Sequence, residues 1–266
     1  MLPKPYWREM PASAFGDQAK NWIAVLPVAA IEQHGPHLPV GVDAIIGEGL
    51  VKRCIAVLPD DLPVTFLPVQ EICKSNEHIS FPGTLTMEWD VVIRGWFNIA
   101  ESVVRAGVGT LVIITSHGGN VAPMEVAARE IREKLGLRVV TTGWGRLGKW
   151  QEIYQYDGPF IDIHAGEAET SEMLVLRPDL VDLDAARSFP SEQTRLAENA
   201  TKLAYHGAPA NISWLAEDLN AAGVVGDPTR ADANQGERDL ASTVEGFMTL
   251  MRDLVAEIEH SKSSHD

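Results

Sequence analysis

Three polar residues near the start of the chain have the types and spacing of a metal site. Glu32 and His34 alternate after the apolar run 23–30, so an extended backbone points both side chains the same way. Asp43 follows beyond a Gly/Pro-rich turn. Carboxylate oxygens and an imidazole nitrogen that converge at a strand end suit a divalent ion such as Zn²⁺ or Mn²⁺. The alternative is a polar turn in which Asp43 caps the following helix.

A second polar cluster, His117-Gly118-Gly119-Asn120, follows the clearest apolar run of the chain. Open parallel sheets bind ligands beyond the carboxyl ends of their strands, where this cluster is expected. Gly118 and Gly119 allow a substrate to approach the backbone closely, and Asn120 can cap the next helix. The alternative is an ordinary strand-to-helix turn with an incidental histidine. Because two strand ends carry ligand-type residues, the sequence favours a metal site built from both.

The stretch 164–171 adds His164 and two carboxylates, Glu167 and Glu169, at the start of an expected helix. One of these carboxylates can simply compensate the helix dipole. We expect Glu169 to act as a catalytic group and a further ligand. His164 is expected to be a proton shuttle, because an imidazole has a pKa of about 6.5, although helix capping is the alternative. Five ligands from separate segments suit two ions that share a carboxylate: Glu32, His34, Asp43, His117 and Glu169.

Two further histidines are candidates for substrate contacts. His37 lies in the turn after His34, where it can orient a metal ligand or serve only as a turn residue. His78 precedes a Phe-Pro-Gly-Thr turn and is expected to line the pocket, although a lone loop histidine is more often structural. The remaining histidines have no partner motif and are expected at the surface: His206, His260 and His265.

Apolar runs alternate with helical periodicity along the chain, which predicts a mainly parallel sheet with helices on both faces. Strands are expected over residues 22–28, 63–69, 109–116 and 138–142, and helices over 44–58, 88–106, 121–135, 167–176 and 237–260. We expect one domain over residues 1–260 and a polar tail over 261–266. The stretch 143–162, rich in glycine and aromatic residues, is either a packed covering loop or a lid over the substrate.

Composition narrows the class of protein. The chain has 266 residues and a net charge of −15 without any run of Lys or Arg, which disfavours a nucleic-acid partner. Cys54 and Cys73 cannot form a disulfide framework, which indicates a reduced, cytoplasmic setting. Neither a signal peptide nor an apolar run of about 18 residues occurs, so no membrane span is expected.

Together, these motifs resemble the creatininase family of metal-dependent amidohydrolases. The resemblance spans most of the chain and is carried, in order, by LPVAAIEQHGPHLPVGVD (26–43), HISFPGTLTM (78–87), TSHGGN (115–120), HAGEAETS (164–171) and, more loosely, GVVGDPT (223–229). It implies a three-layer α/β/α domain and two divalent ions per subunit, with Zn²⁺ expected and Mn²⁺ or Fe²⁺ as alternatives. It also implies C–N amide hydrolysis and a hexamer built as a trimer of dimers.

Position by position, the resemblance implies that Glu32 and His117 hold one ion, His34 holds the other, and Asp43 bridges both. Creatininase itself has a glutamate at the place of Gly119, so this chain must complete the centre differently. We assign the missing ligand to Glu169.

A second departure concerns the substrate. The tryptophan and the acid that help to frame creatinine are absent, with Phe160 and Ile161 roughly in their place, so creatinine is not expected. Family members with His-Gly-Gly-Asn include formamide deformylases and peptide-trimming enzymes of cofactor biosynthesis. We therefore expect a metal-bound hydroxide to cleave a cyclic amide, a formamide or a similar small substrate, with His164 protonating the leaving nitrogen. The alternatives are a lactonase or lyase on the same scaffold, or a non-catalytic metabolite-binding protein.

Overall fold

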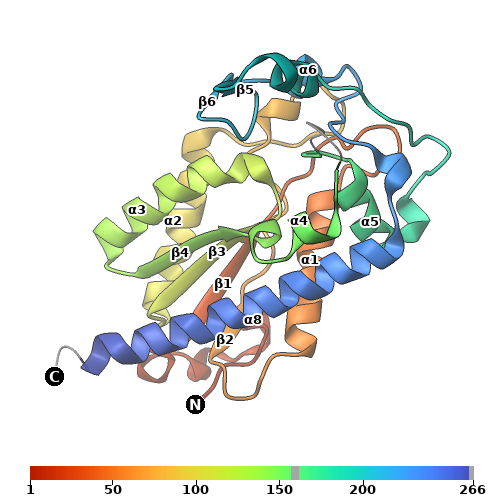
Figure 1. Ribbon diagram of the computed structural model, residues 1–266. Coiled ribbons are helices and arrows are strands. Elements are labelled where there is room, and N and C mark those ends of the chain that lie inside the picture. The colour runs from red at the N-terminus through yellow and green to blue at the C-terminus, as the bar shows by residue number, and fades with distance from the viewer. Residues whose placement is uncertain (157–161, 264–266) are drawn as a thin grey trace.

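A four-stranded parallel sheet forms the centre of the computed structural model, which describes residues 1–156 and 162–263. The strand order is β2-β1-β3-β4 (Figure 1). The strands are β1 (Ile23–Val28), β2 (Val64–Phe66), β3 (Thr110–Thr115) and β4 (Arg138–Gly143). Every residue of β1 and β3 is buried, because helices cover both faces of the sheet. The parallel sheet predicted from the sequence is confirmed.

Two helical layers enclose this sheet (Figure 1). On one face lie α2 (Trp89–Arg105) and α3 (Val121–Leu135), and on the other lie α1 (Val42–Ala56), α5 (Glu167–Leu176) and α8 (Ala233–Ser263). Alternate side chains of β1 pack into separate hydrophobic cores on the two faces of the sheet. Ala24 packs in the core that contains Trp96, and Val25 packs in the core that contains Phe247. The chain is therefore a single three-layer α/β/α domain, as expected.

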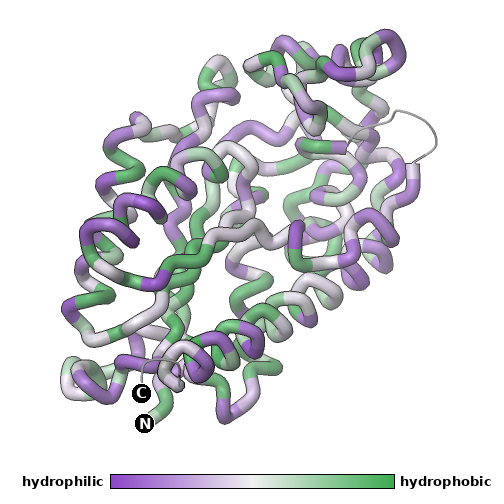
Figure 2. Tube along the Cα trace, turned by 60° about the vertical axis from the view of Figure 1, so that its left-hand side comes forward, coloured by the Kyte–Doolittle hydropathy of each residue, from purple (hydrophilic) through white to green (hydrophobic). Residues whose placement is uncertain are grey.

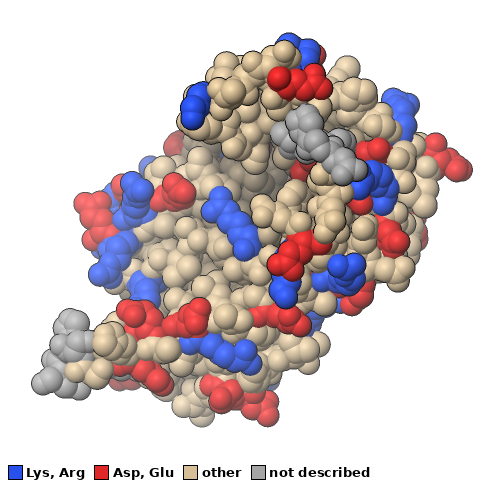
Figure 3. Space-filling view, in the orientation of Figure 1, with Lys and Arg blue, Asp and Glu red and all other residues tan. Residues whose placement is uncertain are grey.

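A small cap lies over one end of the layers, at the top of Figure 1. It contains α6 (Glu192–Asn199), the short parallel pair β5 (Leu203–Ala204) and β6 (Ala210–Asn211), and α7 (Ala216–Leu219). Figure 2 shows hydrophobic segments along the interior strands, whereas the outer helices alternate between hydrophobic and hydrophilic residues. Acidic and basic side chains are interspersed over the face in Figure 3. Among the described residues, no helix is both long and apolar enough to cross a lipid bilayer.

Several element boundaries differ from the predicted ones. Helix α1 begins at Val42 after the N-cap residue Gly41, so Asp43 lies inside the first turn and the capping interpretation of Asp43 is wrong. Strand β2 ends at Phe66, although the chain beyond it stays beside β1, where Gln70 pairs with Val28 through an isolated parallel bridge. Helix α8 continues to Ser263, into the stretch predicted to be a tail. Helices α3 and α5 have the predicted bounds.

The aromatic stretch 143–162 contributes mainly to packing in its described part, which includes α4 (Trp150–Ile153). Trp144 is buried against Phe247, and Tyr154 is buried beside α4. None of the described aromatic residues of this stretch lines the cavity that holds the predicted ligands. The described part is therefore a packed covering segment. Phe160 and Ile161 lie outside the described residues.

Candidate metal centre

Register within the sheet brings the first two motifs together. Val28 pairs with Thr115, so the loops after β1 and β3 leave the sheet side by side. The buried Asn120 side chain joins these loops: Nδ2 donates to the carbonyl oxygen of Ala29 at 2.9 Å, and Oδ1 accepts from the backbone N–H of Lys74 at 3.2 Å. Its side chain does not cap α3, so that prediction was wrong. Asn120 instead tethers three site loops.

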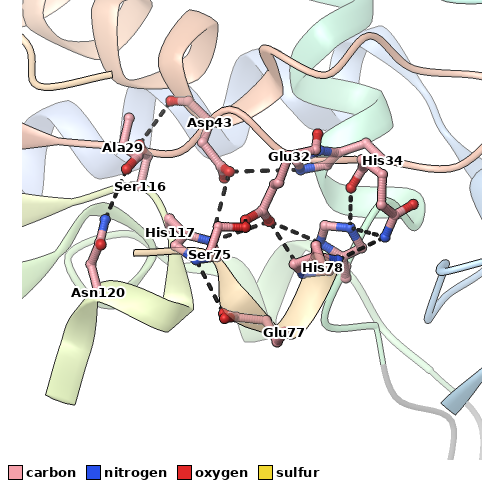
Figure 4. Close-up of polar contacts among 12 residues, drawn as sticks. Ala29, Glu32, His34, Asp43, Ser75, Glu77, His78, Ser116, His117 and Asn120 are labelled. Carbon is pink, nitrogen blue, oxygen red and sulfur yellow. Dashed lines mark hydrogen bonds and ion pairs between the residues drawn. The ribbon is translucent and has the colours of Figure 1, made fainter. Parts of the chain in front are cut away.

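The first group of candidate ligands consists of Glu32, Asp43 and His117, all buried (Figure 4). Nδ1 of His117 lies 3.2 Å from Oε1 of Glu32 and 3.7 Å from Oδ2 of Asp43. The hydroxyl of Ser75 donates to Oε2 of Glu32 at 2.6 Å, which leaves Oε1 facing the group. The ligand atoms all lie within 4.8 Å of one another, a spacing that one ion can bridge.

The second group consists of His34, Asp43 and Glu169. Nε2 of His34 lies 3.9 Å from Oδ2 of Asp43 and 3.8 Å from Oε2 of Glu169. Nδ1 of His34 lies 3.0 Å from the carbonyl oxygen of Glu32, which favours the ring proton on Nδ1 and leaves Nε2 free to bind an ion. The N–H of Ala165, a residue with φ of 55°, donates to Oε2 of Glu169 at 2.6 Å. Asp43 thus belongs to both groups.

Buried polar atoms without hydrogen-bond partners test whether this set fits divalent ions. Oε1 of Glu32, Nε2 of His34 and Oδ2 of Asp43 have no such partner among the described residues. An unsatisfied buried polar atom costs about 1–3 kcal/mol, and more when charged, so three converging ones call for a cation. Burial, reinforced by Glu32, raises the pKa of Asp43 well above its usual range. Against burial, which alone would raise it, His117 holds the pKa of Glu32 well below its usual range, so without an ion the site charges only one of the two carboxylates. A divalent metal would compensate both carboxylates, and the donor set fits one.

His164 and His78 both approach Oε1 of Glu32. Nε2 of His164 lies 2.7 Å from the carbonyl oxygen of Gln33, and Nδ1 lies 3.6 Å from Oε1 of Glu32. Burial lowers the pKa of His164 to about 4, so its imidazole is neutral near pH 7, and the expectation of a pKa near the ordinary value of about 6.5 is wrong. Nε2 of His78 lies 3.4 Å from Oε1 of Glu32, and Nδ1 lies 2.8 Å from Nε2 of Gln33. Glu32, His34 and His164 form a third possible ligand group.

A cavity of about 590 Å³ opens onto both main ligand groups. Of the predicted substrate contacts, His78, Gly118 and Gly119 line it. His37 is buried elsewhere, with Nε2 3.1 Å from the hydroxyl of Thr170, and does not belong to the described lining.

Sequence reasoning missed several parts of this site. Trp89, Tyr205 and Trp214 provide aromatic walls, and the exposed His206 also lines the cavity although it was expected to be only a surface residue. No motif or periodicity marks these positions, because they reach the cavity only through the packing of the cap and α2. Gln33 was also missed, although its place between Glu32 and His34 in the sequence was a usable signal.

The fold and this donor set are those of a metal-dependent hydrolase of the α/β/α class. Residues 8–251 match the sequence profile of Creatininase, described as creatinine amidohydrolase. The chain therefore belongs to the creatininase family, whose members are hydrolases.

Relatives in this family carry different activities in their names. The chain is 30% identical to a mycofactocin precursor peptide peptidase of Mycobacterium ulcerans, over 91% of this chain and 89% of the relative. It is 29% identical to a creatinine amidohydrolase of Pseudomonas putida, over 93% of this chain and 94% of the relative. The family is thus shown, whereas the relatives' names do not agree on a substrate.

Solved structures share the fold. A putative creatinine amidohydrolase from Bacteroides fragilis superposes with a TM-score of 0.77 at 22% identity, covering 96% of this chain and 98% of that one. Creatininases described as a manganese form and a Zn–Zn type both give a TM-score of 0.72, at 25% and 24% identity, covering 94% of this chain and 98% of theirs. Structural neighbours in the family therefore include manganese and zinc forms.

Proposed function

We propose that the protein is a dinuclear metal-dependent amidohydrolase that cleaves a C–N amide bond of a small substrate other than creatinine. The observation that carries this proposal is that Asp43 is shared by two candidate ligand groups. Glu32, Asp43 and His117 would hold the first ion, and His34, Asp43 and Glu169 the second. Zn²⁺ is the expected ion, with Mn²⁺ or Fe²⁺ as alternatives. When bound, such ions supply Lewis acidity that polarises the amide carbonyl and lowers the pKa of water.

His164 is the proposed proton carrier. Its Nε2 faces the carbonyl oxygen of Gln33, which favours the ring proton on Nε2 and leaves Nδ1 facing the centre as a free base. Nδ1 can take a proton from the attacking water and give it to the leaving nitrogen as the C–N bond breaks. The products are then a carboxylic acid and an amine. Glu169, held by the N–H of Ala165, is proposed both to bind the second ion and to face the reacting water.

The cavity lining favours a small substrate with a flat or apolar group beside the amide. A volume of about 590 Å³ lies within the range of small-molecule sites, roughly 300–1,000 Å³. Trp89, Tyr205 and Trp214 offer faces for stacking, and no Lys or Arg belongs to the described lining. A substrate that needs a cationic partner for a carboxylate is therefore disfavoured. The peptidase name of one relative supports an amide other than creatinine as the substrate.

The decisive test measures metal content and turnover together. Elemental analysis of the purified, zinc-reconstituted protein is expected to give two ions per chain, and a panel of amides is expected to include one that releases an amine. Glu32→Ala and His117→Ala are expected to lose the first ion and activity, whereas the exposed Glu71→Ala keeps both. Full metal content and activity in both site variants would refute the proposal. Turnover of lactones without amine release from any amide would favour the lactonase alternative.

We further propose a homo-oligomer, with the family's hexamer as the expected form, acting in the cytoplasm. The exposed apolar side chains of Ile79, Leu85 and Val91 support burial against another subunit. Cys54 and Cys73 are both buried and unpaired, which supports a reducing compartment. Light scattering of the purified protein tests the oligomer, and a monomer at micromolar concentration would contradict it.

A further inference from the structure

The space beside Gly119 is occupied by a carboxylate from another segment. A Cβ atom at residue 119 would lie 2.0 Å from Oε1 of Glu77 and 2.3 Å from Nε2 of His117. Real Cβ atoms essentially never approach other atoms so closely, so this arrangement requires a glycine at residue 119. A Cβ atom at residue 119 would therefore force the Glu77 carboxylate or the His117 ring to shift, and the glutamate that creatininase itself has at this place would compete with Glu77 for the same space.

We infer that Glu77 is the positioning residue for His117 and thereby tunes the first ion site. Oε1 of Glu77 lies 3.2 Å from Nε2 of His117, while Oε1 of Glu32 lies 3.2 Å from Nδ1 of the same ring (Figure 4). The imidazole thus lies between two carboxylates. This inference rests on the proposed two-ion centre.

The position of the proton on the His117 ring determines the roles of the Glu32 and Glu77 carboxylates. A cation beside Glu32 and Asp43 needs the lone pair of Nδ1, so the single proton of neutral His117 must then be on Nε2. Glu77 is the carboxylate that faces that nitrogen. A carboxylate behind a metal-binding histidine fixes the orientation of the ring and raises the basicity of the coordinating nitrogen. Glu77 belongs to no candidate ligand group among the described residues, so it acts through His117.

The segment that carries Glu77 is itself attached to the first site. The hydroxyl of Ser75 donates to Glu32, and Nε2 of His78 lies 3.4 Å from the same carboxylate. The backbone N–H of Ser75 donates to the hydroxyl of Thr86 at 2.9 Å, which anchors the segment from outside. The Glu77 side chain is only 16% exposed, so water screens its charge weakly. Because these contacts join the segment to Glu32, a ligand of the first ion only, we expect the loss of Glu77 to affect the first ion site and not the second.

Calorimetric titration of chelator-treated protein with Zn²⁺ tests this role. Wild-type protein is expected to show two binding events. Glu77→Ala is expected to weaken one of them by about 10–100-fold, the usual effect of losing a partner behind a metal ligand, and to leave the other within about twofold. Glu77→Gln keeps an oxygen acceptor without the charge, so its zinc affinity at the weakened site should fall between those of wild type and Glu77→Ala. The matched control is the exposed Glu71→Gln, which should bind both ions like wild type.

A double-mutant cycle separates positioning from general loop structure. His117→Ala is expected to retain only the second site. If Glu77 acts through His117, adding Glu77→Ala should leave the zinc affinity of that second site within about twofold, whereas a general disturbance of the loop should weaken it further. Gly119→Ala, whose Cβ displaces Glu77 and the ring, should reproduce the selective loss. Two weakened sites, or affinities of Glu77→Ala within twofold of wild type, would overturn the inference while the two-ion centre stands. Wild-type protein that takes up no zinc would refute the proposed function itself.

Discussion

Nε2 of His164 lies 2.7 Å from the backbone carbonyl oxygen of Gln33 and 3.1 Å from its side-chain nitrogen, and the shorter contact favours the ring proton on Nε2. Nδ1 is then a free base that points toward Oε1 of Glu32, 3.6 Å away. His164 lies in the loop before α5, whereas Gln33 and Glu32 lie in the loop after β1. The proposed proton carrier is thus oriented by the loop that also carries the first ligands.

Replacing His164 should separate proton transfer from metal binding. His164→Gln is expected to lower kcat by about 100- to 10,000-fold, the range typical of a lost general acid–base, while two ions remain bound. Turnover and elemental analysis of the same sample check this result. His260→Gln, an exposed position near the end of α8, is the control. Loss of one ion in His164→Gln would instead assign His164 as a ligand, in line with the third ligand group.

Removing the metal should cost both activity and stability. A chelator is expected to abolish turnover, and excess Zn²⁺ should restore it. Free Zn²⁺ at 100 times its dissociation constant should stabilise the folded protein by about 2.7 kcal/mol for each site that binds only the native state. Asp43→Ala should lose this stabilisation because Asp43 belongs to both groups. Thermal unfolding with and without Zn²⁺ checks the prediction, and an unchanged zinc effect in Asp43→Ala would contradict it.

Asn120→Ala should destabilise the fold because Asn120 tethers the site loops. The substitution leaves the carbonyl oxygen of Ala29 and the N–H of Lys74 without their side-chain partner. At about 1–3 kcal/mol for each unsatisfied buried group, the expected loss is about 3 kcal/mol. Urea unfolding measures it, with the exposed Asn199→Ala as the control. A loss no larger than that of the control would show that water replaces these bonds at little cost.

Asp162 should make stability depend on pH. Burial raises its pKa to about 7, although the hydroxyl of Tyr156 donates to Oδ2 at 2.9 Å. The unfolded value is about 3.9, so the folded state binds more protons between pH 4 and pH 7, and this group's contribution to stability decreases as pH rises through that window. Asp162→Asn stays neutral and should gain stability relative to wild type over the same window. Melting temperatures measured across the window check this, and a constant difference between the two proteins would contradict it.

The fold class and the candidate ligand types followed from local patterns. The buried runs of β1 and β3 and the periodicity of α3 and α5 depend on neighbours in the sequence, so their type and position were predictable. The role of Asp43 was less predictable, because a carboxylate near a helix start has the same sequence pattern whether it caps the helix or faces a metal. Only its place inside the first turn of α1, opposite His117, separates the two.

The amino-acid sequence by itself determined the α/β fold, the family and the side chains from which a metal centre can be built, because strand ends and helix starts carry their polar residues in short motifs. Tertiary structure alone decided that Glu77 fills the space beside Gly119, that Asn120 joins loops instead of capping α3, and that Trp89 and Trp214 wall the cavity. Each of these relations joins segments far apart in the chain, and their contacts arise only when the sheet, helices and cap pack together.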